Sequence, residues 1–440
     1  MPDYLILRRT TLPLLLLALA AATARAQNAP VHSESSSNEG PVLTVDRVIE
    51  TALATNPRIG AAREMVSAAR GSRRTARSWT NPSFSYQTEE MDVAGAHGTA
   101  TTAREAMWTG MLPLAPIYQL GSRAARANAE LRGAEADFRT ARREIALRAT
   151  STFFTAALAQ VSVDGLQEVG IWLDSLVAYT RTRVHEGAAA EVDLIRLQVE
   201  QDRAGTDLAI ARAEVAHSRA DLASLIGTDS FAINPVVATR LSLTPTNSAG
   251  FDVLMSQAKS RRPEIAAANA RVEAASAGVS LERQTVFREL GVMAGVKRML
   301  GDASIVAGLT MPLPIFDQNR GEIQRAEAGR RIAAFDRESA ERQVVAEVRA
   351  AYAAVTMLGA QVSRIDRSML QRAEESRRIA EGAYREGATS LTQVLDAARA
   401  LVDARNVYYR AVFARNQSLI ELNAAIGSDN LLTNPSGGLR

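Results

Sequence analysis

The sequence contains no cysteine, which excludes a disulfide framework, a zinc site built on thiolates and a lipidated N-terminal cysteine. Lysine occurs only at Lys259 and Lys297, so lysine-based chemistry has little support. Aromatic residues are also scarce, at 5%. A chain rich in alanine, arginine, glutamate and leucine with only 14 prolines in 440 residues favours long helices over a β-sandwich or an α/β enzyme.

The chain also lacks a clear excess of charge. Its formal net charge is +3, and removing a predicted leader with three arginines and one aspartate leaves 48 basic and 47 acidic residues. A nucleic-acid-binding protein is expected to keep a clustered basic excess, so we expect no nucleic-acid partner. Phosphate-loop, dinucleotide-binding, nucleophile-elbow and zinc-protease motifs are absent from the sequence, which predicts no enzyme, no catalytic residue and no cofactor.

Residues 1–26 have the three parts of a secretory signal peptide. Arg8 and Arg9 precede an apolar stretch at 12–22, and Ala24-Arg25-Ala26 supplies small residues before a cleavage site. The apolar stretch is too short to span a bilayer. Residues 27–41 are small and polar, which predicts a disordered lead-in. Since no later segment approaches 18 uninterrupted apolar residues, we expect an exported chain without a transmembrane helix.

Self-comparison predicts an internal duplication, because four short segments recur in the same order about 200 positions apart. The recurring segments begin at Asn56 and Arg262, at Pro113 and Pro312, at Glu186 and Glu386, and at Leu225 and Ala425. We place the first repeat at 42–230, a linker at 231–250, the second repeat at 251–427 and a tail at 428–440.

Each repeat is expected to contain two short helices, a β-hairpin and a long helical hairpin. Alternating apolar and polar residues predict β-hairpins at about 80–112 and 286–312. The helical hairpins are predicted at 121–226 and 321–426. Because residues 121–184 and 321–384 contain no proline, one uninterrupted helix is expected over each. Apolar residues spaced 3-4-3-4 after position 193 predict a coiled-coil seam.

The four strands point to a membrane barrel built from several copies. Strands of about ten residues suit a transmembrane β-barrel, yet four strands cannot close around a lumen. Three copies would supply twelve strands, with the helices projecting away from the membrane. The predicted fold is therefore mainly α with a small β part. Trp79 and Trp108 flank the first hairpin, either as part of an aromatic girdle or as ordinary half-buried packing.

Two segments carry a resemblance to a known family. Residues 312–323 (PLPIFDQNRGEI) and 384–397 (YREGATSLTQVLDA) are similar to motifs of the TolC family of outer-membrane efflux channels, and the resemblance covers residues 42–430. It implies a homotrimer with a twelve-stranded barrel in outer-membrane lipid and a helical tunnel in the periplasm. The implied function is a passive exit duct, working with a periplasmic adaptor (membrane-fusion) protein and an inner-membrane pump of the resistance–nodulation–division type.

The first of these segments is also similar to the cation-efflux branch of the family, which implies export of metal cations or small toxic compounds. A duct for type I protein secretion is an alternative, and a periplasmic coiled-coil scaffold without a pore is another. Without a cysteine for lipidation, anchoring of the chain is expected to rest on the barrel alone.

The resemblance also implies two sets of site residues. The adaptor is expected to meet the tips of the helical hairpins, where the candidate residues are Arg183, His185, Gly187, Tyr384, Arg385, Glu386, Gly387 and Ser390. The two glycines are also explained as helix caps. The family's acidic tunnel entrance corresponds to Gln393 and Asp396, and Asp193 is a further candidate. A solvated aspartate in a first helical turn is the alternative for Asp396.

No metal site is predicted from the histidines. The four are His32, His97, His185 and His217, and no two have ligand spacing. A single exposed histidine at a hairpin tip is the simplest explanation for His185.

Overall fold

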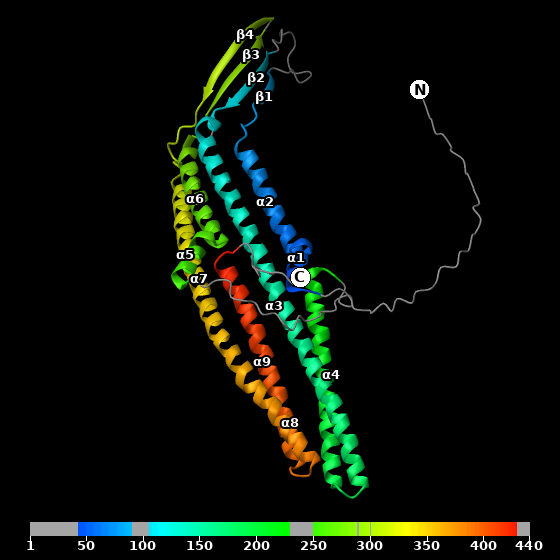
Figure 1. Ribbon diagram of the computed structural model, residues 1–440. Coiled ribbons are helices and arrows are strands. Elements are labelled where there is room, and N and C mark those ends of the chain that lie inside the picture. Colours follow the sequence, from blue (N-terminus) through cyan, green and yellow to red (C-terminus); the bar gives the residue numbers. More distant parts are fainter. Residues whose placement is uncertain (1–42, 90–104, 229–249, 288–289, 300, 429–440) are drawn as a thin grey trace, which may run out of the picture. The chain divides into compact units, whose positions relative to one another are not determined.

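The computed structural model describes residues 43–89, 105–228, 250–287, 290–299 and 301–428 (Figure 1). The predicted leader, the lead-in and nearly all of the linker and tail lie outside these residues, as do His32 and His97. No helix in the described ranges is both long and apolar enough to cross a membrane.

The same order of elements occurs twice along the chain. The first half comprises α1 (Val45–Thr55), α2 (Pro57–Ala76), β1 (Ser83–Glu89), β2 (Glu105–Pro113), α3 (Ala115–His185) and α4 (Glu191–Ile226). The second half comprises α5 (Phe251–Arg261), α6 (Pro263–Gln284), a 3-10 turn η2 (Thr285–Phe287), β3 (Gly291–Met299), β4 (Asp302–Thr310), α7 (Arg320–Arg364), a π-helical segment η3 (Ile365–Leu370), α8 (Gln371–Arg385) and α9 (Leu391–Ala425). The prediction of a mainly helical chain with a small β part is confirmed.

Helix boundaries follow local chemistry. Thr44 caps α1 by accepting a hydrogen bond from the Arg47 backbone amide, and prolines occupy the first positions of α2 and α6. At 1.5 Å per residue, the 71 residues of α3 extend over roughly 105 Å.

The long helical segment of the second half, from α7 to α8, differs from its prediction. An uninterrupted helix was expected over 321–384, but η3 interrupts the α-helical hydrogen bonding between α7 and α8. Ile365, the first residue of this segment, is buried, with 4% of its surface exposed. Neither glycine nor proline marks this segment, so the local sequence carries no signal of the interruption.

The four strands form one antiparallel sheet in the order β1-β2-β3-β4. The central pair, β2 with β3, joins strands from the two halves of the chain. Since β1 and β4 lie at the outside, the described part of a single chain leaves one edge of each without a strand partner.

The register separates the side chains onto two faces of the sheet. One face is apolar and exposed, and it carries Phe84, Tyr86, Trp108, Leu112, Val292, Ala294, Val296, Ile305, Ala307 and Leu309. The other face carries mostly Ser, Thr, Gln, Gly and Met, together with the ion pair between Lys297 and Glu105. Polar residues appear on the apolar face only at the hairpin end, where Thr88 and Arg298 lie.

Trp108 lies inside β2, the returning strand of the first hairpin, and not at the flank of the hairpin. Its ring lies 5.4 Å from that of Tyr86 on the neighbouring strand, and the Arg298 guanidinium lies 5.9 Å above it. Trp79 precedes β1 and is 53% exposed. Trp108 therefore takes part in cross-strand aromatic packing.

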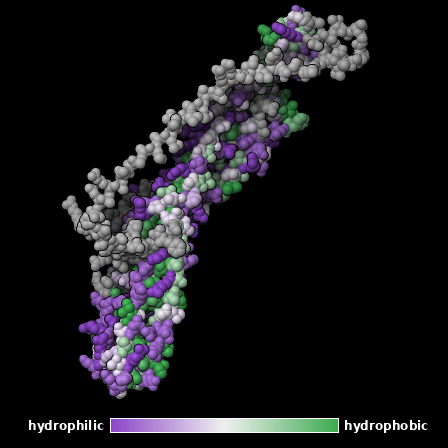
Figure 2. Space-filling model, turned by 90° about the vertical axis from the view of Figure 1, so that its right-hand side faces the viewer, coloured by the Kyte–Doolittle hydropathy of each residue, from purple (hydrophilic) through white to green (hydrophobic). Residues whose placement is uncertain are grey.

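In the described part of the chain, four apolar clusters hold the helices together, the smallest of them between α3 and α4 at Ala159, Val163 and Val215. The largest joins α1, α3, α4 and α9 through side chains that include Val48, Phe153, Leu222 and Ile420. A second joins α5, α7 and α9, and a third joins α3, α4, α8 and α9 near the hairpin tips. The side of the helices seen in Figure 2 is largely hydrophilic, with apolar surface in patches between polar side chains.

A buried arginine connects several helices at the junction of α5 and α6. The Arg262 side chain is 1% exposed and donates to Glu264 at 2.8 Å, to Glu347 of α7 at 2.6 Å and to the Ala425 carbonyl of α9 at 3.1 Å. Arg143 of α3 also donates to Glu264. Two arginines and two glutamates thus balance their charges among α3, α6 and α7, and the Ala425 carbonyl adds a neutral contact with α9.

Within this cluster, the pKa of Glu264 is lowered. Burial alone would raise the pKa of Glu264, but the hydrogen bond from Arg262 and the charge of Arg143 hold it below its ordinary value of 4.5. A carboxyl group whose pKa is lower in the folded state stabilises the protein at neutral pH. That contribution is lost as the pH falls through the folded-state pKa.

We expect Arg262→Met to lower the stability of the folded chain by about 3 kcal/mol, because it removes a buried cation with hydrogen bonds to two half-buried carboxylates and leaves Arg143 alone to balance both of them. The matched control is Arg271→Met in α6, the helix that Arg262 precedes. The pair of Arg271 with Asp137 is about half exposed and is worth at most about 1 kcal/mol. Thermal unfolding of the detergent-solubilised protein, followed by circular dichroism, measures both. Equal midpoints for the two variants would show that the Arg262 cluster is not a stabilising centre.

Candidate functional site

The two helical hairpins end in turns of the same kind. Gly187 between α3 and α4 and Gly387 between α8 and α9 have φ of 73° and 76°, the left-handed region that glycine adopts without strain. In each turn the next amide donates back to a carbonyl five residues earlier, Ala188 to Arg183 at 2.7 Å and Ala388 to Ala383 at 2.8 Å. Each long helix is therefore capped by a Schellman-type turn.

Aromatic and cationic side chains join the two tips. Tyr384 of α8 is 6% exposed, and its hydroxyl lies 3.3 Å from that of Thr180 on α3. The Arg183 guanidinium lies 5.8 Å from the ring of Tyr179 and 6.0 Å from that of Tyr384, and it donates to the Ala188 carbonyl at 3.0 Å. Arg183 and Tyr384 therefore hold one hairpin tip against the other.

The other predicted tip residues face solvent. His185, Glu386 and Ser390 are exposed, and Arg385 is exposed while donating to Glu381 at 2.6 Å. The structure thus divides the predicted docking residues into an internal pair and a set of exposed polar groups.

The predicted entrance residues lie at the start of α9 and α4. Asp396 is 65% exposed, and its carboxylate lies 3.5 Å from the Arg399 guanidinium. Arg399 also pairs with Glu200 of α4. The hydrogen bond to Glu200 raises the pKa of Arg399, so this group stays cationic beside Asp396. Asp193 lies in the first turn of α4 and is half-buried.

Sequence reasoning missed Arg399 and Glu200. The spacing of Asp396 and Arg399, three residues apart on one helix, was a usable signal for their pair. The contact between Arg399 and Glu200 joins residues 199 positions apart, and no local sequence pattern predicts it.

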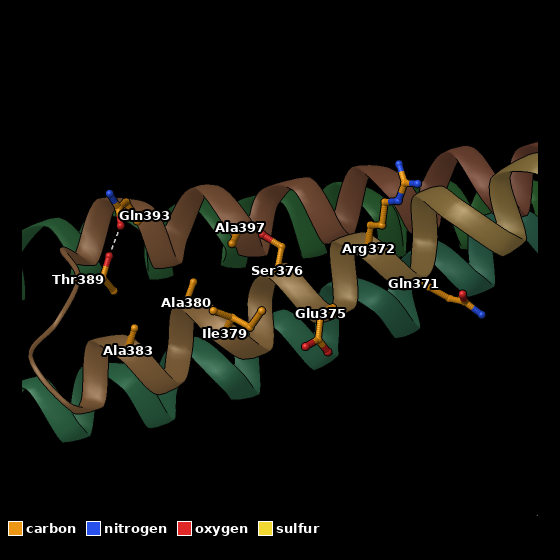
Figure 3. A pocket seen from close by; sticks show the side chains of 10 residues that line it. All are labelled: Gln371, Arg372, Glu375, Ser376, Ile379, Ala380, Ala383, Thr389, Gln393 and Ala397. Atoms are coloured by element: carbon orange, nitrogen blue, oxygen red, sulfur yellow. Dashed lines mark hydrogen bonds between the residues drawn. The ribbon is translucent and has the colours of Figure 1, made fainter.

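An open groove of about 660 Å³ runs between α8 and α9 next to the tip (Figure 3). Small side chains form much of its surface, and Gln393 lies at its tip end, bonded to Thr389. The residues that line it are Gln371, Arg372, Glu375, Ser376, Ile379, Ala380, Ala383, Thr389, Gln393 and Ala397. A groove of this form suits an elongated apolar partner better than a small enclosed ligand.

The described residues contain no group of three His, Asp or Glu side chains that would hold a metal ion. His185 is exposed at its tip, and His217 lies 3.7 Å from Asp221 on the surface of α4.

Comparison with known proteins gives a consistent picture. A family model described as "Outer membrane efflux protein" matches residues 48–228 and 254–428. The cobalt-zinc-cadmium resistance protein CzcC of Cupriavidus metallidurans is 27% identical over 442 residues, covering 96% of this chain and all of that protein. The nickel-cobalt-cadmium resistance protein NccC of Alcaligenes xylosoxydans is 26% identical over 66% of this chain and 64% of that protein. The pyoverdine export outer membrane protein OpmQ of Pseudomonas putida is 31% identical over 42% of this chain and 43% of that protein.

Solved structures share the fold. CusC has a TM-score of 0.75 at 20% identity, covering 88% of this chain and 93% of that chain. The outer membrane protein VceC of Vibrio cholerae has a TM-score of 0.71 at 19% identity, covering 87% of this chain and 96% of that one. At these identities the likeness shows the fold, which is that of outer-membrane channels.

Proposed function

This chain belongs to the outer membrane efflux protein family, and we propose that three copies of it form a passive duct that carries metal cations out of the cell. The resemblance seen in the sequence is thereby confirmed, and the protein is one of the outer membrane. The trimer, the exported substrate and the partners are the parts that we infer.

The sheet carries the proposal. Its exposed face is apolar along most of its length, and three of its strands have nine residues, close to what a tilted strand needs to cross a bilayer. The edges of β1 and β4 have no strand partner in the described part of the chain, and unpaired backbone groups are not tolerated in lipid. Three four-stranded sheets joined edge to edge would make a closed twelve-stranded barrel.

An internal duplication fits this architecture. The family model matches twice along the chain, and the two halves have the same order of elements. The junctions of α1 with α2 and of α5 with α6 make equivalent hydrogen bonds to the ends of later helices. Asn56 donates to the Leu225 carbonyl of α4 at 3.3 Å, and Arg262 donates to the Ala425 carbonyl of α9 at 3.1 Å. Two copies of one unit, each with a β-hairpin and a helical hairpin, account for these correspondences.

The names of two relatives support the choice of substrate. CzcC and NccC are both named for resistance to divalent metals, and CzcC aligns over nearly the whole chain. OpmQ, named for pyoverdine export, aligns over less than half of it. Metal cations are therefore the favoured cargo, with small toxic compounds as the second candidate.

The helical hairpins are the proposed contact with the rest of the pump. An adaptor protein would meet the exposed tip residues His185, Glu386 and Ser390, with Gly187 and Gly387 shaping the turns. Arg183 and Tyr384 would act by holding the tips together. A proton-driven pump of the resistance–nodulation–division type in the inner membrane would supply the energy.

Asp396 is the proposed selectivity residue of the tunnel entrance. Three copies would place three such carboxylates around one axis, a ring that attracts cations and repels anions. Arg399 partly neutralises each one, so the expected field is weaker than that of an unpaired ring. Gln393 is uncharged, which leaves one acidic position per chain in this pair.

Cells that lack this chain should accumulate more cobalt, zinc or cadmium than the parent strain, because the last step of export is missing. Elemental analysis of washed cells measures the metal, and restoring the wild-type gene provides the control. Unchanged metal content together with loss of a secreted protein would contradict metal export and favour a duct for type I secretion.

Asp396→Asn should lower the preference for cations in planar-bilayer recordings at low salt, because it removes three charges per trimer with little change in volume. Arg399→Gln should raise that preference by unmasking the same carboxylate. Glu386→Gln, which removes an exposed tip charge, is the matched control and should leave ion preference unchanged. If all three variants conduct like the wild type, Asp396 is a solvated residue of the helix start.

A further inference from the structure

Methionine is distributed unevenly over the two faces of the sheet. In the described strands it occurs at Met107 and Met111 of β2 and at Met293 and Met299 of β3. The register places all four on the face opposite the exposed apolar one, which is called the polar face below. Most aromatic and β-branched apolar side chains, which strands usually carry, lie on the apolar face. Methionine is therefore a specific feature of the polar face.

Two of the four methionines are direct neighbours across the central strand pair. Met111 of β2 lies opposite Met293 of β3, and both side chains are half-buried. Residues directly opposite each other on one face of a sheet have Cβ atoms about 4.5–5.5 Å apart. A methionine side chain has three rotatable bonds, so the two sulfur atoms can turn toward one point.

Small residues surround this pair. Ser83 of β1 lies opposite Met111, and Gly308 of β4 lies opposite Met293. A Cβ atom on Gly291 would lie 2.8 Å from the Met111 methyl group, and one on Gly308 would lie 3.2 Å from the Met293 methyl group. The two glycines therefore provide the space that the methionine side chains occupy, and no larger neighbour on these strands encloses the pair.

We propose that Met111 and Met293 form a binding site for a soft monovalent metal ion, Cu(I) or Ag(I), on the pore side of the sheet. The inference rests on the proposed function, because the polar face lines a pore only if the apolar face lies in lipid. It adds soft monovalent ions to the metal cations proposed above as cargo.

The chemistry of the pair favours soft ions over the divalent ones. Thioether sulfur is a soft, uncharged ligand that suits Cu(I), whereas zinc and cobalt are bound better by imidazole and carboxylate groups. Within the described strands, the first charged group along the polar face from Met293 is Lys297, four residues or about 13 Å away. Lys297 is paired with Glu105, so it does not repel a cation strongly.

The position of the pair suits an ion in transit. Met111 lies near the end of β2, four residues before α3 begins, so the pair is at the helical end of the sheet (Figure 1). In the proposed trimer, three identical pairs would lie at one level, where the tunnel opens into the barrel. A conducting pore must bind an ion weakly enough to release it, and two uncharged ligands meet that requirement.

Silver binding to the full-length protein in mild detergent tests the site, with Ag(I) nitrate as the probe in a chloride-free buffer. The wild type should bind about one Ag(I) per chain more than the double variant Met111→Leu with Met293→Leu, because leucine offers no ligand atom. Equilibrium dialysis with elemental analysis measures the bound silver. The matched control is Met357→Leu on α7, an exposed methionine away from the sheet, and it should bind as much silver as the wild type.

Methyl-labelled methionine gives a second readout that does not depend on how well the variants fold. In NMR spectra of the wild type, Ag(I) should shift the methyl signals of Met111 and Met293 and leave that of Met357 in place. Zn(II) at the same concentration should shift none of the three. The single variants assign the signals, and leucine nearly preserves the volume of methionine.

Equal silver binding by the wild type and the double variant would overturn the site. So would NMR shifts that leave Met111 and Met293 unaffected. Either result would leave the proposed duct intact if cells lacking the chain still accumulate metal. Conversely, silver binding at this pair together with unchanged metal content in those cells would keep the site and contradict the duct.

Discussion

The structure depends on one constraint, which is that a lipid bilayer offers no hydrogen bonds to an exposed strand edge. In the described part of the chain the sheet has an apolar face, and the outer edges of β1 and β4 have no strand partner. If this sheet lies in lipid, as proposed, it cannot remain there as a single copy. In the proposed trimer, closing the barrel settles the number of copies and brings the helices of three chains around one axis. The turns at Gly187 and Gly387 then lie at the far end of these helices, where a duct needs its entrance and its contact with a pump.

The two halves of the chain share an order of elements but differ in their chemistry. The junction of α1 and α2 is tied to the end of α4 by neutral hydrogen bonds from Thr55 and Asn56. At the corresponding junction of α5 and α6, the contact with α9 is made by Arg262. Its charge is balanced by hydrogen bonds to Glu264 and Glu347. Likewise α3 is uninterrupted, whereas the second arm contains a π-helical segment. The two halves thus meet the same packing requirement with different side chains.

Much of the fold could be predicted from the sequence, because periodicity, glycine and proline are local signals. Alternation predicted the hairpin strands, and the glycines at the tips predicted where the long helices reverse. The interruption at Ile365 could not be predicted, since no glycine or proline marks it. The sequence also left hidden the contact of Arg399 with Glu200 and the packing of Tyr384 on Arg183, because these join residues about 200 positions apart. Such contacts depend on how the helices pack against each other, and local patterns in a single sequence do not predict them.

The central claim is that identical copies of the chain close the four-stranded sheet into a barrel. Native mass spectrometry of the full-length protein, extracted from outer membranes in mild detergent, tests it most directly. The predicted result is one species with the mass of three chains, resistant to dilution, with the strand content of the folded protein. A stable monomer with full strand content would contradict the account, because its two sheet edges would then persist without partners.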